Sequence, residues 1–177
     1  MNIFAIEPKS DGSIDWNQSA LSHDNFRVNK MIIESCQMLS TTAKTFGYDT
    51  RYKMSHLNHP STIWARESLP NFNNLLRLGQ SLRAEFCRRH KKQGHGCDDV
   101  LMHMAQLSHD DDFAKHFPST HETKLPLCMP DEYKSADVVE SYRRFFANKP
   151  NLRYYSKDVP LWIAEYRQDG MPEVKIV

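Results

Sequence analysis

The segment of residues 28–43, VNKMIIESCQMLSTTA, constrains the fold most, because in a helical conformation it is apolar nearly all round. At about 100° per residue, Lys30, Glu34, Gln37 and Thr41 project within roughly 60° of one another, and apolar side chains cover most of the remaining circumference. Such a helix is expected to be buried among other helices. Its polar stripe is then expected to face a polar cleft or a ligand. In the alternative interpretation the stripe faces water, and Lys30 and Glu34 form an ordinary i,i+4 ion pair.

Length and composition limit the class of protein. A chain of 177 residues is long enough for one domain with a substantial core. Its 23 basic and 22 acidic residues give a net charge of +1, so any contact with nucleic acid must be local. No apolar run is long enough to span a bilayer, and the N-terminus lacks the features of a signal peptide. We therefore expect a cytoplasmic protein, in an infected host cell if it is viral, with no membrane partner.

The distribution of cysteines and histidines argues against a metal site. The four cysteines lie far apart without a CxxC motif, which favours reduced thiols over disulfides or structural zinc. The nine histidines include close pairs, but none forms an HExxH motif. The chain also has no GxSxG motif and no phosphate-binding loop of the GxxxxGK type. We therefore expect no metal and no cofactor.

The hydrophobic pattern predicts a mainly α, single compact helical domain over residues 1–177. A short apolar N-terminal segment, residues 2–6, is expected to be extended, either as an edge strand or as a tucked arm. Three prolines in residues 108–134 exclude a long helix there, and this irregular loop is predicted to cover a functional site. The expected helices span residues of about 25–46, 61–68, 70–93, 98–107 and 136–147.

A second dense polar motif follows the first helix, in the sequence HPSTIWARESLPN of residues 59–71. Trp64 and Arg66 would offer a nucleotide a stacking plane and a phosphate-binding fork. In the alternative, Trp64 belongs to the core and Arg66 pairs with Glu67 or Glu34. The pocket expected around the polar stripe comprises Gln37, His59, Trp64, Arg66 and Asn71, joined by His95 from a Gly-His-Gly turn and by Glu132 from the long loop.

Basic residues gather at the end of the long helix and again in the second half of the chain. Arg88 and Arg89, with Arg143 and the neighbouring Arg144 and Lys149, would form one surface that follows a phosphate backbone. The alternative is that these charges simply solvate helix faces.

Three motifs together resemble a family of small proteins common in tailed phages and other large DNA viruses. That resemblance covers most of the chain and implies a phage-type protein, while it leaves the reaction open. The motifs read Val28-x-Lys30-Met31-Ile32-x-Glu34-x-x-Gln37-x-Leu39, then Asn58-His59-Pro60-x-x-x-Trp64-x-Arg66-Glu67-Ser68-x-x-Asn71, then Met129-Pro130-Asp131-Glu132-Tyr133-Lys134 with Tyr142-Arg143.

The order of elements also resembles that of pyrimidine-dimer DNA glycosylases of the endonuclease V class. The pieces that look similar are the N-terminal segment, Glu34, the Asn58-His59-Pro60 element, the long basic helix and an aromatic C-terminal segment. In that class an α-amine attacks the sugar and a glutamate assists, which is sound chemistry because α-amines are partly unprotonated near neutral pH. Those enzymes expose a small residue after methionine is removed, whereas Asn2 follows Met1 here.

The resemblance implies a DNA glycosylase or lyase that acts on damaged or modified pyrimidines. Glu34 would be the acid–base group, and the nucleophile would be the amine of Met1 or of Lys30, provided that Lys30 is desolvated and its pKa lowered. Its partner would be DNA. The alternatives are a viral binder of a nucleotide or nucleotide signal and a counter-defence protein that targets a host protein.

Overall fold

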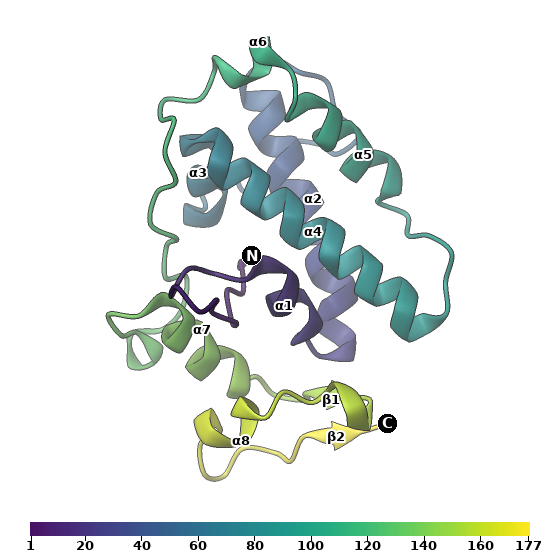
Figure 1. The fold of residues 1–177 in the computed structure, drawn as a ribbon, viewed down its shortest axis with the longest axis vertical. Coiled ribbons are helices and arrows are strands. Elements are labelled where there is room, and N and C mark those ends of the chain that lie inside the picture. The colour runs from purple at the N-terminus through teal and green to yellow at the C-terminus, as the bar shows by residue number, and fades with distance from the viewer.

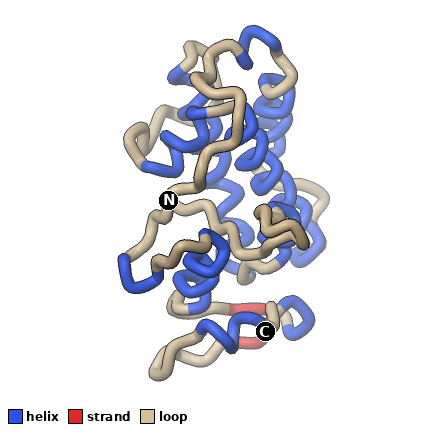
Figure 2. Tube along the Cα trace, turned by 60° about the vertical axis from the view of Figure 1, so that its left-hand side comes forward, coloured by secondary structure: helices blue, strands red, loops and turns tan.

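The computed structural model describes all 177 residues and confirms a mainly helical fold (Figure 1). Eight α-helices pack together, with two 3₁₀ turns, η1 (Asp131–Tyr133) and η2 (Ser156–Asp158). The only sheet pairs β1 (Arg153–Tyr154) with β2 (Lys175–Ile176), two short parallel strands at one end of the molecule (Figure 2). The helices are α1 (Trp16–Leu21), α2 (Asn25–Thr45), α3 (Pro60–Glu67), α4 (Leu69–His90), α5 (Asp98–Leu107), α6 (Asp111–Ala114), α7 (Val138–Ala147) and α8 (Trp162–Tyr166).

The helix predicted as central, α2, is central. Asp24 caps it by accepting from the Arg27 N–H, and α4 crosses in front of it in the view of Figure 1. Helices α2, α4 and α5 approach one another closely at Gly79 of α4. A Cβ added to this glycine would lie 3.1 Å from Leu101 Cδ2 of α5 and 3.4 Å from Ser35 Cβ of α2. Eleven of the 21 residues of α2 are buried, which is the outcome that its nearly all-round apolar surface predicted.

The five predicted helices are present, with ends that differ by at most three residues from expectation. The long helix ends at His90 and not at residue 93, because Lys91 takes the left-handed conformation, with φ of 50°, three residues before the expected glycine stop. The helices α1, α6 and α8 were not expected, and all three are six residues or shorter. Such short segments give too few turns for a periodic apolar pattern.

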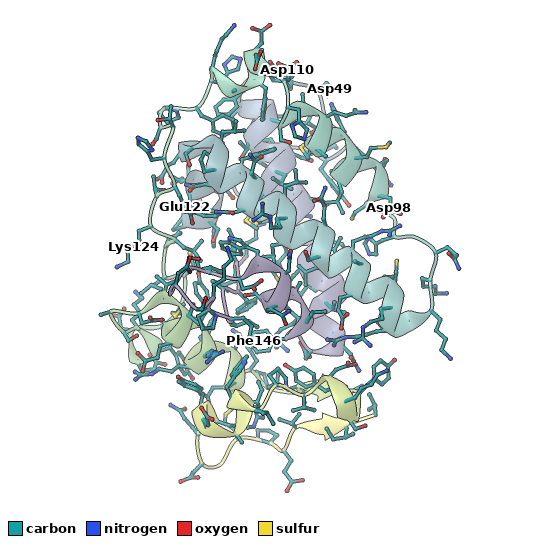
Figure 3. The ribbon with its side chains drawn as sticks, viewed as in Figure 1. Asp49, Asp98, Asp110, Glu122, Lys124 and Phe146 are labelled. Carbon is teal, nitrogen blue, oxygen red and sulfur yellow. The ribbon has the colours of Figure 1, made fainter.

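The N-terminal segment is a tucked arm. Residues Ile3, Phe4, Ala5 and Ile6 are buried, and the Ile6 N–H donates to Ser19 Oγ of α1 at 3.1 Å. The Phe4 ring packs edge-on against Phe146 of α7, with centroids 5.0 Å apart; Figure 3 labels Phe146, at the junction of α7 with the rest of the fold. The arm thus lies between the first helices and α7.

Residues 108–134 do not cover the polar stripe, so that prediction was wrong. The segment packs instead along the outer edge of α3 and α4, where Glu122 and Lys124 are exposed (Figure 3). It is held there because the Asn71 side chain bonds to both the backbone and the hydroxyl of Thr123. None of its residues lines the pocket described below.

None of the helices combines the length and the apolar character that crossing a lipid bilayer requires.

Candidate functional site

The polar stripe of α2 borders a pocket of about 120 Å³ at the place where three distant parts of the chain meet. The N-terminal arm supplies Met1, Asn2 and Phe4, and Lys149 comes from the residues that follow α7. The contribution of α2 consists of Phe26, Arg27, Lys30, Met31 and Glu34.

Glu34 is the carboxylate of this pocket. Its side chain is 15% exposed, and Oε1 lies 3.4 Å from Lys30 Nζ while Oε2 accepts the Asn2 N–H at 3.4 Å. The second contact fixes the N-terminal arm against α2 and places Met1 beside the carboxylate. The structure therefore brings together the three residues predicted to carry chemistry, Glu34, Lys30 and Met1.

Lys30 does not meet the condition set for it as a nucleophile. Its side chain is 53% exposed, so it is not desolvated as that role required. The ion pair with Glu34 is the i,i+4 pair that was the alternative interpretation, here at the rim of a pocket.

Lys149 is the half-buried amine of this pocket, whereas the sequence pattern predicted only that it belongs to a general basic surface. No carboxylate pairs with it, and Nζ lies 3.3 Å from the centroid of the Phe145 ring. Burial, and then the nearby charges of Arg27 and Lys30, lower the pKa of Lys149 to about 8. The one sequence signal was its i,i+4 spacing from Phe145, which is too common to indicate a site.

His59 lies close enough to this pocket to be influenced by its charges. The ring caps α3, with Nδ1 accepting the Ser61 N–H at 3.2 Å, so a neutral ring carries its proton on Nε2. Burial lowers the pKa of His59, as do the Met1 amine and His56, whereas Glu34 opposes the shift. Gln37, one turn beyond Glu34 in α2, is half-buried, and its side chain forms no hydrogen bond within the chain.

An unpaired acceptor also lines the pocket. The side-chain oxygen of Asn2, Oδ1, is buried and has no hydrogen-bond partner within the protein. Buried polar atoms are nearly always satisfied, so this oxygen is an exception that the chain itself does not pair.

Two residues predicted to bind a ligand belong to the core instead. Trp64 is buried, and its indole N–H donates to the Thr123 carbonyl at 3.0 Å, so neither ring face is open for stacking. Asn71 is fully buried, and its amide donates to the Trp64 carbonyl at 2.8 Å and to Thr123 Oγ1 at 2.7 Å. Its Oδ1 accepts the Thr123 N–H, so no polar atom remains for a ligand.

Three further candidates lie outside the pocket. Arg66 donates to the Leu57 carbonyl at 2.7 Å and does not line the pocket; the alternative, a pairing with Glu67 or Glu34, does not occur either. His95 faces Asn29 Oδ1 at 2.9 Å on another side of α2. Glu132 is exposed and lines a separate cavity of about 350 Å³.

The arginines predicted to hold phosphates are bound within the chain. Arg89 is buried, and its Nε donates to Glu85 at 2.6 Å; Arg88 contacts the same carboxylate at 2.6 Å and Asp158 at 2.6 Å. Arg143 donates from Nε to the Ile6 carbonyl at 2.7 Å and from Nη2 to Glu7 at 2.6 Å. These guanidinium groups hold the fold together, and Arg143 in particular fixes the N-terminal arm.

The charges at the pocket are mostly positive. Arg27, Lys30, Lys149 and the Met1 amine surround it, and Glu34 is the one carboxylate in its lining. No group of three histidine, cysteine, aspartate or glutamate side chains is arranged to hold a metal ion anywhere in the chain. The pocket is thus a small, amine-rich site next to one carboxylate, which suits chemistry on an anionic or electrophilic substrate.

Comparisons with protein-family models, with curated proteins and with solved structures found no match for this chain.

Proposed function

We propose that this protein acts on DNA as a glycosylase or lyase for damaged or modified pyrimidines, using an amine of the pocket as nucleophile. The observation that carries this proposal is the presence of amine-bearing residues, Met1, Lys30 and Lys149, beside the single carboxylate of Glu34. Imine-forming catalysis requires a neutral amine and a nearby group that moves protons.

The chemistry assigns a definite role to each group. A neutral amine attacks C1′ of the deoxyribose, the bond from C1′ to the base breaks, and the base leaves with the electron pair and accepts a proton. The sugar ring then opens as O4′ accepts a proton and the nitrogen forms an imine with C1′. Glu34 lies where it can give and take these protons, because one oxygen faces Lys30 and the other faces the N-terminal arm.

Of the three amines, Lys149 meets the requirement for neutrality best. It is half-buried, lacks a carboxylate partner and has the lowered pKa. Lys30 is more than half exposed and is held by Glu34 in an ion pair. Met1 remains the alternative that the resemblance to pyrimidine-dimer glycosylases implies.

The size of the pocket favours DNA over a free nucleotide. Pockets that enclose a small-molecule ligand usually measure roughly 300–1,000 Å³, whereas this one measures about 120 Å³. It is too small to enclose a nucleotide but large enough for one reacting group presented by a larger molecule. A nucleotide-sequestering protein and a binder of a host protein remain the alternative functions.

The test is borohydride trapping on UV-irradiated, uracil-containing and phage-modified DNA. We expect a covalent adduct with the parent protein, and no product with Glu34→Gln. Lys149→Arg keeps the charge but cannot form the imine, so it abolishes the adduct if Lys149 is the nucleophile; Lys30→Arg is the matched control. A two-residue extension before Met1 tests the α-amine in the same way.

Cleavage without an adduct would indicate a glycosylase that uses water and Glu34. Absence of both cleavage and adduct on all three kinds of DNA would refute the proposal. Nucleotide binding and capture of a host protein would then be tested directly.

A further inference from the structure

Phe26 is an exposed aromatic residue at the rim of the pocket. It is the second residue of α2, its exposed fraction is 62%, and it lines the pocket together with Arg27 and Lys30. Its ring packs against no other aromatic ring of the chain, although its neighbours in the pocket include several polar groups. A large apolar ring left in water beside a polar site is typical of a contact surface.

Basic residues line the pocket beside this ring. Lys149 lies in the pocket without a carboxylate contact, and the nearby Arg27 and Lys30 repel its charge. Arg27 is already paired with Asp24 at 3.1 Å. Lys30 is paired with Glu34 at 3.4 Å, but its side chain is 53% exposed, so it is the basic group of this rim that a phosphate in solution can reach.

We propose that Phe26 stacks on an unpaired base of DNA while Lys30, exposed at the same rim, binds a flanking phosphate. This inference rests on the proposed function, because it concerns the DNA segment whose sugar enters the same pocket. Aromatic rings beside basic side chains are the usual means of binding unpaired nucleotides, since every base has a face that can stack. The small pocket would then hold the reacting sugar, and Phe26 would hold a base outside it.

The inference also specifies the form of the DNA. A fully paired duplex offers no open base face, so Phe26 contributes only where a base is unstacked, as at an abasic site or a single-base bulge. The phosphate contact, in contrast, is the same for paired and unpaired DNA and weakens with salt.

The experiment measures binding by fluorescence anisotropy with two labelled oligonucleotides, a paired duplex and the same duplex with one unpaired base. We expect Phe26→Leu to weaken binding of the bulged duplex about tenfold or more and to leave the paired duplex nearly unchanged. Phe26→Trp should retain the preference. Met102→Ala is the matched control, because Met102 of α5 is also 62% exposed and does not line the pocket.

Lys30→Ala should weaken binding of both oligonucleotides equally and reduce the slope of affinity against salt concentration. Equal binding of the bulged duplex by Phe26→Leu and the parent, with unchanged circular dichroism, would overturn the inference. Failure of the parent to bind either oligonucleotide would overturn it as well.

The outcomes separate this inference from the proposed function. Binding is measured with Glu34→Gln, which retains Phe26 and Lys30 but cannot complete the chemistry. A trapped adduct with no effect of Phe26→Leu refutes the stacking and leaves the function standing. Loss of the bulge preference in Phe26→Leu, without cleavage or adduct by the parent, supports the stacking and refutes the glycosylase proposal.

Discussion

Acidification is expected to destabilise this protein through His23, a fully buried histidine at the start of the loop before α2. Its Nδ1 lies 2.7 Å from the Ser19 carbonyl and donates to it, and its ring packs edge-on against Phe4 and Phe146. Its Nε2 is buried without a partner. Burial lowers the pKa of His23 from 6.5 to about 3, and the charges of Arg89 and Arg27 act in the same direction.

The sign and size of the effect follow from linkage. Below pH 6.5 the unfolded chain binds a proton at His23, whereas the folded chain does not until the pH approaches 3. The free energy of unfolding therefore has its full value above pH 6.5 and decreases as the pH is lowered toward 3. Each pH unit in that window costs about 1.4 kcal/mol, so at pH 5 the loss from this one residue is about 2 kcal/mol. Carboxylates with lowered pKa values, such as Asp98, start from an ordinary value of 3.8 and act at lower pH.

The assay is urea unfolding followed by circular dichroism at pH 7, 6 and 5, for the parent and for His23→Phe. The variant keeps an aromatic ring but leaves the Ser19 carbonyl unpaired, so it is less stable at pH 7. Its free energy of unfolding should nevertheless fall less steeply with pH than that of the parent. Equal slopes for the two proteins would refute the assignment of the pH effect to His23.

Three further substitutions test the packing around the site. Asn71→Ala should cost about 1–3 kcal/mol and expose the segment around Thr123 to proteolysis, because it removes the bonds that hold this segment to α4; thermal unfolding and limited trypsin digestion measure both effects. Arg89→Ala should cost about 3–5 kcal/mol in urea unfolding, since it leaves the buried Glu85 carboxylate without its closest buried partner. Gly79→Val should cost about 1–3 kcal/mol by the same measurement, because its side chain would press against two neighbouring helices.

The fold could be predicted from the sequence where a periodic apolar pattern extended over many residues. The apolar circumference of residues 28–43 predicted a buried central helix, and the cap at Asp24 and the proline-bounded segments fixed most of the other helix ends. The path of residues 108–134 could not be predicted, because it depends on hydrogen bonds between Asn71 and Thr123, 52 residues apart in the sequence. Local patterns carry no information about such a contact.

The part of the candidate site that lies on α2 could be predicted from the sequence, whereas the part contributed by other elements could not. Glu34 and Lys30 were visible because both interrupt an apolar helix at i,i+4 spacing. Lys149 was not singled out, because its role depends on α7 packing across the N-terminal arm. Trp64 and Arg89 were wrongly predicted to bind a ligand, because both are buried by tertiary packing. The sequence shows the residue type but not this burial.

The arrangement of the arm ties the candidate site to the whole fold. Met1 and Asn2 reach Glu34 only because Phe4 is buried against α7 and because Arg143 of α7 holds the Ile6 carbonyl. The same helix, α7, leads directly to Lys149. Two of the three amine-bearing residues at the pocket therefore depend on one packing interaction, between the N-terminal arm and α7. An amine site assembled in this way exists only in the folded chain, whereas the Lys30–Glu34 pair can form within α2 alone.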